Sequence, residues 1–314
     1  MNVYHSIESF QPLPAAVVTS GTFDGVHLGH QRILARLIES ARATGGQSVV
    51  LTFWPHPRTV VSNDSRELKL LSTLDEKIEL MEKAGVEHLV VIPFTRSFSE
   101  LSSEDFIRQI LMERIGTRKL VIGYDHRFGR NREGGFEYLS QHGHEYGFEI
   151  EEIPRQDIEA VGVSSSKIRA ALLEGNIGTA NKYLGRPYSL SGTIVKGRQL
   201  GRTIGYPTAN IQVDDAIKLI PANGVYAVDV LYRGQTLMGA MNIGTRPTVA
   251  GTHRTVEVYI LDFDQDIYGE HLTVGMQEYL RPELKFNGLP ELVEQMHLDV
   301  EKTRELFRQK PPTP

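Results

Sequence analysis

The chain has 314 residues, of which 40% are hydrophobic and 23% are charged, and its formal net charge is −5. This length is enough for two domains, the composition is that of an ordinary globular protein, and the acidic balance argues against a nucleic-acid binder. The absence of cysteine excludes disulfides, thiolate metal sites and a cysteine nucleophile. Because residues 1–8 lack a signal-peptide pattern and no apolar run reaches membrane length, we expect a cytoplasmic protein with no membrane partner.

A glycine-rich stretch at residues 21–30 lies between two apolar patterns. The apolar run at 15–18 predicts a short buried strand, and helical spacing over 33–41 predicts a helix that two glycines end. Such a turn aims backbone N–H groups and the positive end of a helix dipole at one point, where an anion binds. His27 and His30 add side-chain donors there. A plain strand-to-helix connection, or a fragment of a zinc site without a third ligand, is the alternative.

Strands and helices alternate through the rest of the first half. Further apolar runs predict strands at 48–53, 88–94, 119–123 and 148–153, with helical patterns between them at 75–84 and from 102 to 111. Strands that are apolar throughout and separated by helices predict an α/β fold with a doubly wound parallel sheet. Ligands bind at the carboxyl ends of such strands, so we expect one rim to carry the turns at 21–30, 54–58 and 123–129.

Two further segments of the first half carry polar side chains suited to a nucleotide. The turn at 123–129 combines Asp125 with an aromatic residue and arginine, and is either a binding loop or a solvated one. Three serines at 164–166 begin a predicted helix, where they are either a simple cap or part of a second anion site. Lys167 and Arg169 favour the second reading, a site for β- and γ-phosphates.

The spacing of the hydrophobic residues changes near residues 183–187, where helical spacing stops. Short alternating segments with frequent glycine follow at 188–195, 224–231, 236–243, 255–262 and 272–279, with a hairpin turn at 233–235. Strands at this spacing without helices predict an antiparallel β-barrel, and helical spacing over 288–309 predicts one terminal helix packed on it. We therefore expect two domains, residues 1–184 and residues 185–314.

Two features of the second domain carry chemistry. The first is a stretch rich in glycine and basic residues over 192–202, either a phosphate-holding flap or a flexible loop. Thr208 and Asn210 follow it, two apart on a predicted strand, so their oxygens share a face and suit Mg²⁺ with ATP phosphates. The second is Glu257, which lies on a strand face opposite Val256 and Val258. It is either solvent-facing or, beside such a Mg²⁺ site, a general base.

These motifs together resemble a known family. The His-x-Gly-His pattern at 27–30 is similar to the signature of nucleotidyltransferases, whose histidines bind a nucleoside triphosphate. In order along the chain, the motifs at 23–30, 55–58, 127–129 and 164–169 and those at 207–210, 223–226, 242–248 and 257–269 resemble the bacterial bifunctional riboflavin kinase/FAD synthetases. This resemblance spans nearly the whole chain.

The resemblance implies two consecutive ATP-dependent reactions on flavins. The barrel would phosphorylate riboflavin to FMN with Mg²⁺, and the first domain would join AMP from ATP to FMN, giving FAD and pyrophosphate. It implies an N-terminal ATP site of Gly21, Phe23, Asp24, His27, Gly29, His30, Ser164, Ser165, Lys167 and Arg169. FMN or nucleotide contacts would come from Pro57, Arg58, Asp125, Arg127 and Phe128. In the barrel it implies phosphate contacts from Gly192, Lys196, Gly197, Arg202, Thr208 and Asn210, with Glu257 as general base.

A few positions depart from the family pattern. His126 stands where an aromatic residue is expected, Ser166 replaces threonine, and Tyr206 and Tyr259 replace phenylalanine and histidine. The resemblance implies small-molecule substrates, no nucleic-acid partner, and a monomer or weak homo-oligomer. Two rival hypotheses are a class I aminoacyl-tRNA synthetase, for which the basic tRNA-binding domain is missing, and a non-catalytic flavin carrier.

Overall fold

The computed structural model describes residues 1–62, 68–124, 126–154, 162–197, 199–248 and 251–309. The chain divides into two compact units, Met1–Ser165 and Ser166–Pro314. Among the described residues, no helix is both long enough and apolar enough to cross a bilayer.

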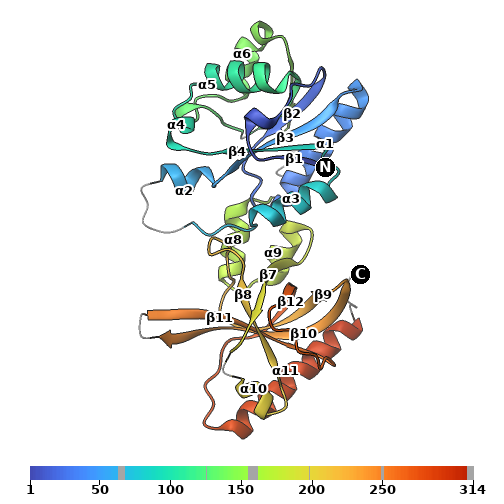
Figure 1. The fold of residues 1–314 in the computed structure, drawn as a ribbon, viewed down its shortest axis with the longest axis vertical. Coiled ribbons are helices and arrows are strands. Elements are labelled where there is room, and N and C mark those ends of the chain that lie inside the picture. Colours follow the sequence, from blue (N-terminus) through green and yellow to red (C-terminus); the bar gives the residue numbers. More distant parts are fainter. Residues whose placement is uncertain (63–67, 125, 155–161, 198, 249–250, 310–314) are drawn as a thin grey trace. The chain divides into compact units, whose positions relative to one another are not determined.

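The first unit is built on a sheet of six parallel strands. Figure 1 shows this sheet with helices around it. They are β1 (Asn2–Tyr4), β2 (Ala16–Ser20), β3 (Gln47–Trp54), β4 (His88–Pro93), β5 (Thr117–Gly123) and β6 (Glu149–Ile153). Neighbours pair in the order β1-β4-β3-β2-β5-β6, and every pair is parallel. The helices are α1 (Leu28–Thr44), α2 (Pro57–Val61), α3 (Leu74–Lys83), α4 (Arg96–Ser99), α5 (Ser103–Asp105) and α6 (Phe136–Tyr146), with the π-helix η3 (Phe106–Ile115) and the 3₁₀ turns η1 (Ile7–Ser9), η2 (Asp24–Val26) and η4 (Arg130–Arg132).

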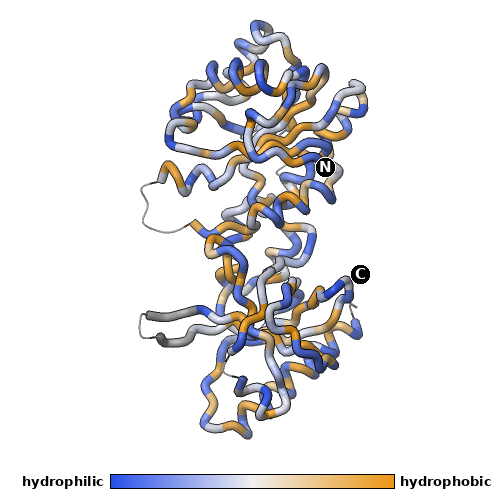
Figure 2. The backbone as a smooth tube through the Cα atoms, viewed as in Figure 1, coloured by the Kyte–Doolittle hydropathy of each residue, from blue (hydrophilic) through white to orange (hydrophobic). Residues whose placement is uncertain are grey.

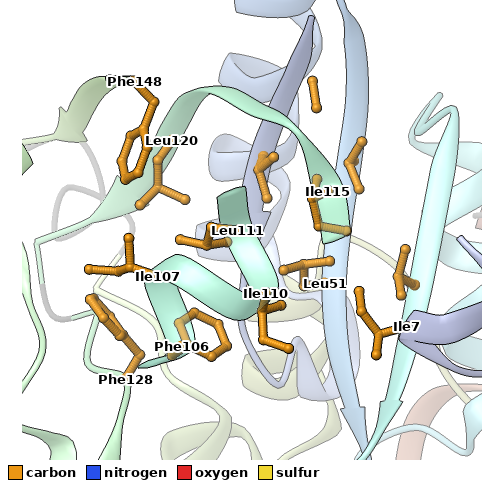
Figure 3. Packing of buried hydrophobic residues seen from close by; sticks show 14 of the residues in the cluster. Ile7, Leu51, Phe106, Ile107, Ile110, Leu111, Ile115, Leu120, Phe128 and Phe148 are labelled. Atoms are coloured by element: carbon orange, nitrogen blue, oxygen red, sulfur yellow. The ribbon is translucent and has the colours of Figure 1, made fainter. Parts of the chain in front are cut away.

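Each face of this sheet has its own hydrophobic core, because successive side chains of a strand point to opposite sides. On one face Leu51 of β3 packs with Ile107 and Leu111 of η3 (Figure 3). On the other face Val17 of β2 packs with Leu34 of α1. Figure 2 shows hydrophobic residues along the strands and alternation along the helices. The predicted doubly wound parallel sheet is confirmed.

The strand order predicts a ligand-binding crevice beside β2. From β2 the chain proceeds through β3 and β4 in one direction, and β5 and β6 lie on the other side of β2. A doubly wound sheet binds ligands at this change of direction, outside the carboxyl ends of the strands. The three turns expected on one rim follow β2, β3 and β5, which are neighbours in the sheet.

Two elements of the first unit differ from expectation. The sequence analysis did not identify β1, which is only three residues long and pairs with β4 from Asn2 opposite His88 to Tyr4 opposite Val90. The helix expected after residue 102 begins there, with Ser102 as its cap, but continues as a π-helix over η3. The periodicity of apolar residues does not distinguish an α-helix from this wider helix over ten residues.

The second unit contains a closed antiparallel barrel, as the sequence predicted. Its strands are β7 (Tyr188–Val195), β8 (Thr208–Val213), β9 (Gly224–Tyr232), β10 (Gln235–Thr248), β11 (Gly251–Ile260) and β12 (His271–Arg281), and they close in the order β10-β11-β8-β7-β12-β9. The hairpin turn between β9 and β10 has positive φ at both Arg233 (48°) and Gly234 (79°), as a two-residue hairpin turn requires. The helices of this unit are α8 (Ser165–Leu173), α9 (Ile177–Leu184), α10 (Leu200–Thr203) and α11 (Leu289–Gln309).

The terminal helix α11 is held to the barrel by a buried ion pair. The guanidinium of Arg281, at the end of β12, donates from Nε to Oδ1 of Asp299 (2.9 Å) and from Nη2 to Oδ2 (2.7 Å). Their side chains are only 16% and 9% exposed. A second fork joins Arg304 of the same helix to Asp262, at 2.7 Å for both contacts, but Asp262 is 64% exposed.

Candidate active sites

The glycine-rich turn of the first unit has an unusual backbone. Phe23 (φ 47°), Gly25 (φ 78°) and Val26 (φ 38°) all lie in the left-handed region. For a β-branched residue such as Val26 this conformation costs on the order of 1–3 kcal/mol, and it persists only where surrounding contacts enforce it. Here they turn the chain from β2 into α1, so that the N-terminus of α1 lies at the carboxyl end of the sheet.

His27 and His30 lie together at the start of α1. The Nδ1 atom of His27 caps the helix by accepting the N–H of His30 (3.3 Å), and the two imidazoles stack with centroids 3.7 Å apart and planes 14° apart. Gly29 makes this possible, because a Cβ there would lie 3.2 Å from the ring of His27. The structure therefore brings the two predicted histidines to one point.

The imidazole of His30 is neutral at neutral pH. Burial, then the charge of a protonated His27, then that of Lys77 lower the pKa of His30 well below its ordinary value. Its Nδ1 atom is buried and has no hydrogen-bond partner among the described residues. Phe23 contacts the same ring edge to face, at 5.2 Å between centroids. A buried ring nitrogen without a partner beside a helix N-terminus suits a ligand that supplies the missing contact.

The carboxylate of Asp24 binds backbone groups of a neighbouring segment. Its side chain is buried, and Oδ1 accepts the backbone N–H groups of Leu71 (2.9 Å) and Ser72 (3.3 Å). The backbone N–H of Gly25 in turn donates to Oγ of Ser72 (3.1 Å). These contacts fasten the turn to the segment before α3, so the geometry gives Asp24 a role in holding the turn.

The serine segment at the start of α8 contacts the same turn. Oγ of Ser165 donates to the backbone carbonyl of Asp24 (3.0 Å), and Ser164 is the residue before it. Lys167 and Arg169 lie further along α8 and belong to the second unit, where Lys167 is exposed and Arg169 half-buried. The structure thus joins Ser165, of the predicted anion site, directly to the glycine-rich turn.

The turn after β3 presents one exposed cation. Pro57 is the first residue of α2, and His56 caps this helix by accepting the N–H of Arg58 on its Nδ1 atom (3.2 Å). The side chain of Arg58 is exposed. The local sequence forms a short helix because proline at the first position needs no N–H partner.

The turn after β5 is divided between the core and the rim. Arg127 is exposed, whereas Phe128 is buried in the core with its ring 5.4 Å from that of Phe106. His126 donates or accepts a 2.9 Å hydrogen bond between its Nε2 and Oγ of Ser20, at the end of β2. The residue that departs from the family pattern therefore connects both sides of the crevice. Asp125 lies outside the described residues.

The sequence analysis missed Lys77. This lysine of α3 is 2% exposed, its ammonium lies 3.4 Å from Oγ1 of Thr52 and 5.4 Å from the centre of the Trp54 ring. Lys77 lies three residues after Leu74 and four before Met81, at a position of the helix that normally carries an apolar residue. A lysine at a core position of an amphipathic helix is the signal that identifies it.

In the barrel, strand register brings together the three residues predicted for phosphoryl transfer. Asn210 of β8 lies directly opposite Glu257 of β11, and Thr208 lies opposite Tyr259. Ala209 and Val258, between them, form the next opposed pair, and Val258 is buried in the barrel. The predicted metal pair and the predicted base therefore share the outer face of two neighbouring strands.

Asn242 completes this row on the other side. It lies opposite Glu257 in the pairing of β10 with β11, so that Glu257 is flanked by the amides of Asn210 and Asn242 across three strands. The sequence analysis included Asn242 in a motif without giving it a site role. Only the register of β10 against β11 shows that it is a neighbour of Glu257.

The basic stretch 192–202 has two different parts. Gly192 lies within β7, where a Cβ would collide with the backbone carbonyl of Gln212, so strand packing accounts for it. Gly197 lies in the loop that follows and abuts the side-chain amide of Asn210. Two other side chains of this stretch contact Tyr268. The Lys196 ammonium lies 5.8 Å from the centre of the Tyr268 ring, and Gln199 Nε2 donates to the Tyr268 hydroxyl (3.3 Å).

A pocket of about 230 Å³ opens beside this loop. Its apolar wall comes from Ile194, Ala209, Val258 and Ile260. Its polar lining residues include Gln199, Arg202, Thr208, Asp264, Asp266 and Tyr268. Among the described residues no three His, Cys, Asp or Glu side chains gather as a metal site.

Both halves of the chain match known protein families. The family model described as FAD synthetase matches residues 10–167, and that described as riboflavin kinase matches residues 184–307. The bifunctional riboflavin kinase/FMN adenylyltransferase of Listeria monocytogenes is 41% identical over 292 residues, 93% of this chain and 92% of the relative. That of Escherichia coli strain K12 is 39% identical over 297 residues, 94% of each chain. A crystal structure described as a macrolide-efflux protein from Streptococcus pneumoniae has a TM-score of 0.87 and 32% identity, covering 96% of this chain and 98% of that one.

Proposed function

The chain belongs to the bifunctional riboflavin kinase/FMN adenylyltransferase family, and from this premise we propose which of its residues carry out each reaction. It phosphorylates riboflavin to FMN and adenylylates FMN to FAD, with ATP as the second substrate of both steps. The observation that carries this conclusion is that the two family models match successive segments, in the order of the two units.

The first unit carries out adenylyl transfer. A phosphate oxygen of FMN attacks the α-phosphorus of ATP, a new P–O bond forms, and the bond to the β-phosphate breaks as pyrophosphate leaves. His27 and His30, with Gly21 and Gly29 giving access to the backbone N–H groups of the turn, stabilise the charge that develops on the α-phosphate oxygens. The stacked histidines at the start of α1 support this assignment.

The remaining contacts of the first reaction are assigned from the sequence motifs to which they belong. Ser164, Ser165, Lys167 and Arg169 hold the β- and γ-phosphates, and the hydrogen bond from Ser165 to the turn supports this. Pro57, Arg58, Asp125 and Arg127 contact FMN or the nucleotide. Three of the predicted site residues are buried and hold the turns in place without contacting a ligand: Phe23, Asp24 and Phe128.

The barrel carries out phosphoryl transfer. Glu257 accepts the proton of the terminal ribityl hydroxyl of riboflavin, whose oxygen attacks the γ-phosphorus of ATP while ADP leaves. Thr208 and Asn210 hold Mg²⁺, which supplies charge neutralisation on the ATP phosphates when bound. The donor set fits this ion, because Mg²⁺ is usually held by one or two protein oxygens together with phosphates and water.

The pocket beside the flap suits the nucleoside part of ATP. Its apolar wall accepts a flat base and its polar rim reaches Thr208, which connects the pocket to the proposed Mg²⁺ site. Lys196 and Gly197 then lie on the loop that borders the phosphates, and Arg202 lies on the short helix α10 that follows it. Gly192 shapes the strand that leads into the loop.

Two variants, one in each unit, test which unit catalyses which reaction. Glu257→Gln removes the base, so FMN formation from riboflavin is expected to fall about 100-fold or more, while FAD formation from supplied FMN stays unchanged. His30→Ala is expected to lower FAD formation by about 100-fold or more and to leave FMN formation intact. Product time courses by chromatography measure both.

Glu278→Gln is the matched control, because Glu278 is an exposed glutamate on another strand of the same barrel. It is expected to leave both reactions unchanged. Wild-type kinase turnover in Glu257→Gln would contradict the assignment of the general base.

We also propose a cytoplasmic location and a monomer or weak homo-oligomer. The lack of cysteine and the nature of the substrates support the location. All residues assigned to the two reactions come from one chain, so no second copy is required. Light scattering after size exclusion measures the assembly state directly.

A further inference from the structure

One buried cation near the proposed adenylyl-transfer site has no role in the scheme above. Lys77 of α3 is 2% exposed, and a lysine is almost never buried to this extent without a partner. It lies on the same core face of the helix as Met81, which is also buried. Burying its charge is costly, so a purely structural role would be served better by an apolar residue at this position.

The contacts of Lys77 lead to the glycine-rich turn. Its Nζ atom lies 3.4 Å from Oγ1 of Thr52, and this hydroxyl donates in turn to the carbonyl of Thr22 at 3.4 Å. The ammonium also lies over the ring of Trp54 at 5.4 Å. Its opposite charge is Asp24, whose carboxylate holds the turn to the segment before α3.

The charged groups around Lys77 balance one another. Burial lowers the pKa of Lys77 to about 8, and Asp24 opposes this shift, so the ammonium is charged at neutral pH. His30 is the next titratable group, and the charge of Lys77 adds to burial and to His27 in lowering the pKa of His30. The side chains that face Lys77 from β3, Thr52 and Trp54, carry no charge.

We propose that Lys77 is a positioning residue of the adenylyl-transfer site: through Thr52 it fixes the backbone of the turn at Thr22, and its buried charge acts on His30. This inference rests on the proposed role of His30. A neutral imidazole binds the ground state of a polyphosphate less strongly than a fixed cation does, and its contact strengthens as charge develops at the α-phosphate. Such a contact favours the transition state over the substrate.

The test compares Lys77→Met, Lys77→Arg and the control Lys83→Met, which removes an exposed lysine from the same helix. FAD formation from supplied FMN is measured from about pH 5 to pH 9, and the ring of His30 is titrated by NMR, with its signal assigned from His30→Ala. FMN formation by the same chains serves as the internal standard for enzyme concentration.

In Lys77→Met, the titration of His30 is expected to move to higher pH, and the acid limb of FAD formation is expected to move with it. The kcat of this step falls by up to about 100-fold, since misplacement of the turn disturbs the alignment of the reacting groups, and the KM for ATP changes less. Lys77→Arg keeps the charge, so His30 titrates as in the wild type, and Lys83→Met changes neither quantity.

Two results overturn the proposal. The first is an unchanged titration of His30 in a folded Lys77→Met chain, with activity reduced by the same factor at every pH. If Lys77→Met does not fold, Lys77→Arg provides the second result. An upward shift of the His30 titration in that variant would overturn the proposal. Failure of the underlying assignment is distinct, because His30→Ala would then form FAD at the wild-type rate whatever the NMR titration shows.

Discussion

The ammonium of Lys77 makes the stability of the first unit depend on pH in the alkaline range. Its pKa is lowered from 10.5 to about 8 in the folded chain, so between these values the unfolded chain binds the proton more tightly. The free energy of unfolding therefore rises from about pH 8 to pH 10.5, by about 3 kcal/mol from this group. Below pH 8 both states are charged and the contribution is constant.

Lys77→Met is expected to lack this rise. The difference in the free energy of unfolding between the wild type and the variant, measured in urea at pH 7.5 and pH 10, should change by about 2–3 kcal/mol in favour of the wild type at the higher pH. Equal differences at the two pH values would show that the buried lysine releases its proton at its ordinary pKa.

Single residues of the site differ in how far the sequence reveals them. His27 and His30 are apparent because they lie three apart at the start of a predicted helix. The contacts of Asp24 are not, because its partners Leu71 and Ser72 come 47 and 48 residues later, in a segment with no motif of its own. Asp24 was therefore assigned to a ligand, whereas the geometry explains its burial through the backbone groups that it binds.

At the level of elements, α11 is fastened by two similar ion pairs that should differ in strength. Arg281 and Asp299 are nearly buried, so Asp299→Asn leaves a guanidinium without its counter-charge and is expected to destabilise the second unit by about 2 kcal/mol. Asp262→Asn removes an exposed partner of Arg304 and is expected to cost less than about 1 kcal/mol. Hydrogen exchange of amides in β12 and α11 reports both changes.

The comparison is well matched because each pair is a forked arginine–carboxylate contact with one partner on α11. Equal destabilisation by the two substitutions would mean that burial does not determine what these contacts contribute.

The elements that the sequence predicted are those with strong periodicity. Apolar runs identified β2 to β6, and alternation identified five barrel strands, because each of these strands has at least five residues. β1 was missed because three residues at a sheet edge carry no such pattern, and pairing with β4 alone makes them a strand. The π-helix η3 was missed for a different reason, since its apolar residues also fit an α-helix.

At the level of the whole molecule, two sites on one chain should be separable by mixing. Glu257→Gln chains form FAD only from FMN, and His30→Ala chains form only FMN. An equimolar mixture is therefore expected to convert riboflavin to FAD after a lag in which free FMN accumulates, as measured by chromatography. Failure of the mixture, with each variant active in its own step, would mean that FMN does not pass through solution.

The domain boundary predicted from the sequence differs from the boundary between the two compact units. The proposed functional boundary lies after Leu184, where helical spacing ends, whereas the compact units divide after Ser165. The difference consists of α8 and α9, which pack on the barrel: Asn181 Nδ2 donates to the carbonyl of Met276 (2.7 Å), and the N–H of Ala222 donates to the carbonyl of Leu172 (2.9 Å). Helical periodicity identifies a helix but not the core that it joins.

Trp54, beneath the ammonium of Lys77, is the single tryptophan among 314 residues. Its emission, excited at wavelengths where the twelve tyrosines do not absorb, arises from the first unit alone. Nucleotide binding and urea unfolding in that unit are therefore visible as changes in fluorescence to which the barrel contributes nothing. Because the chain has no cysteine, one thiol introduced into the barrel would accept a dye selectively and give the second unit a signal of its own.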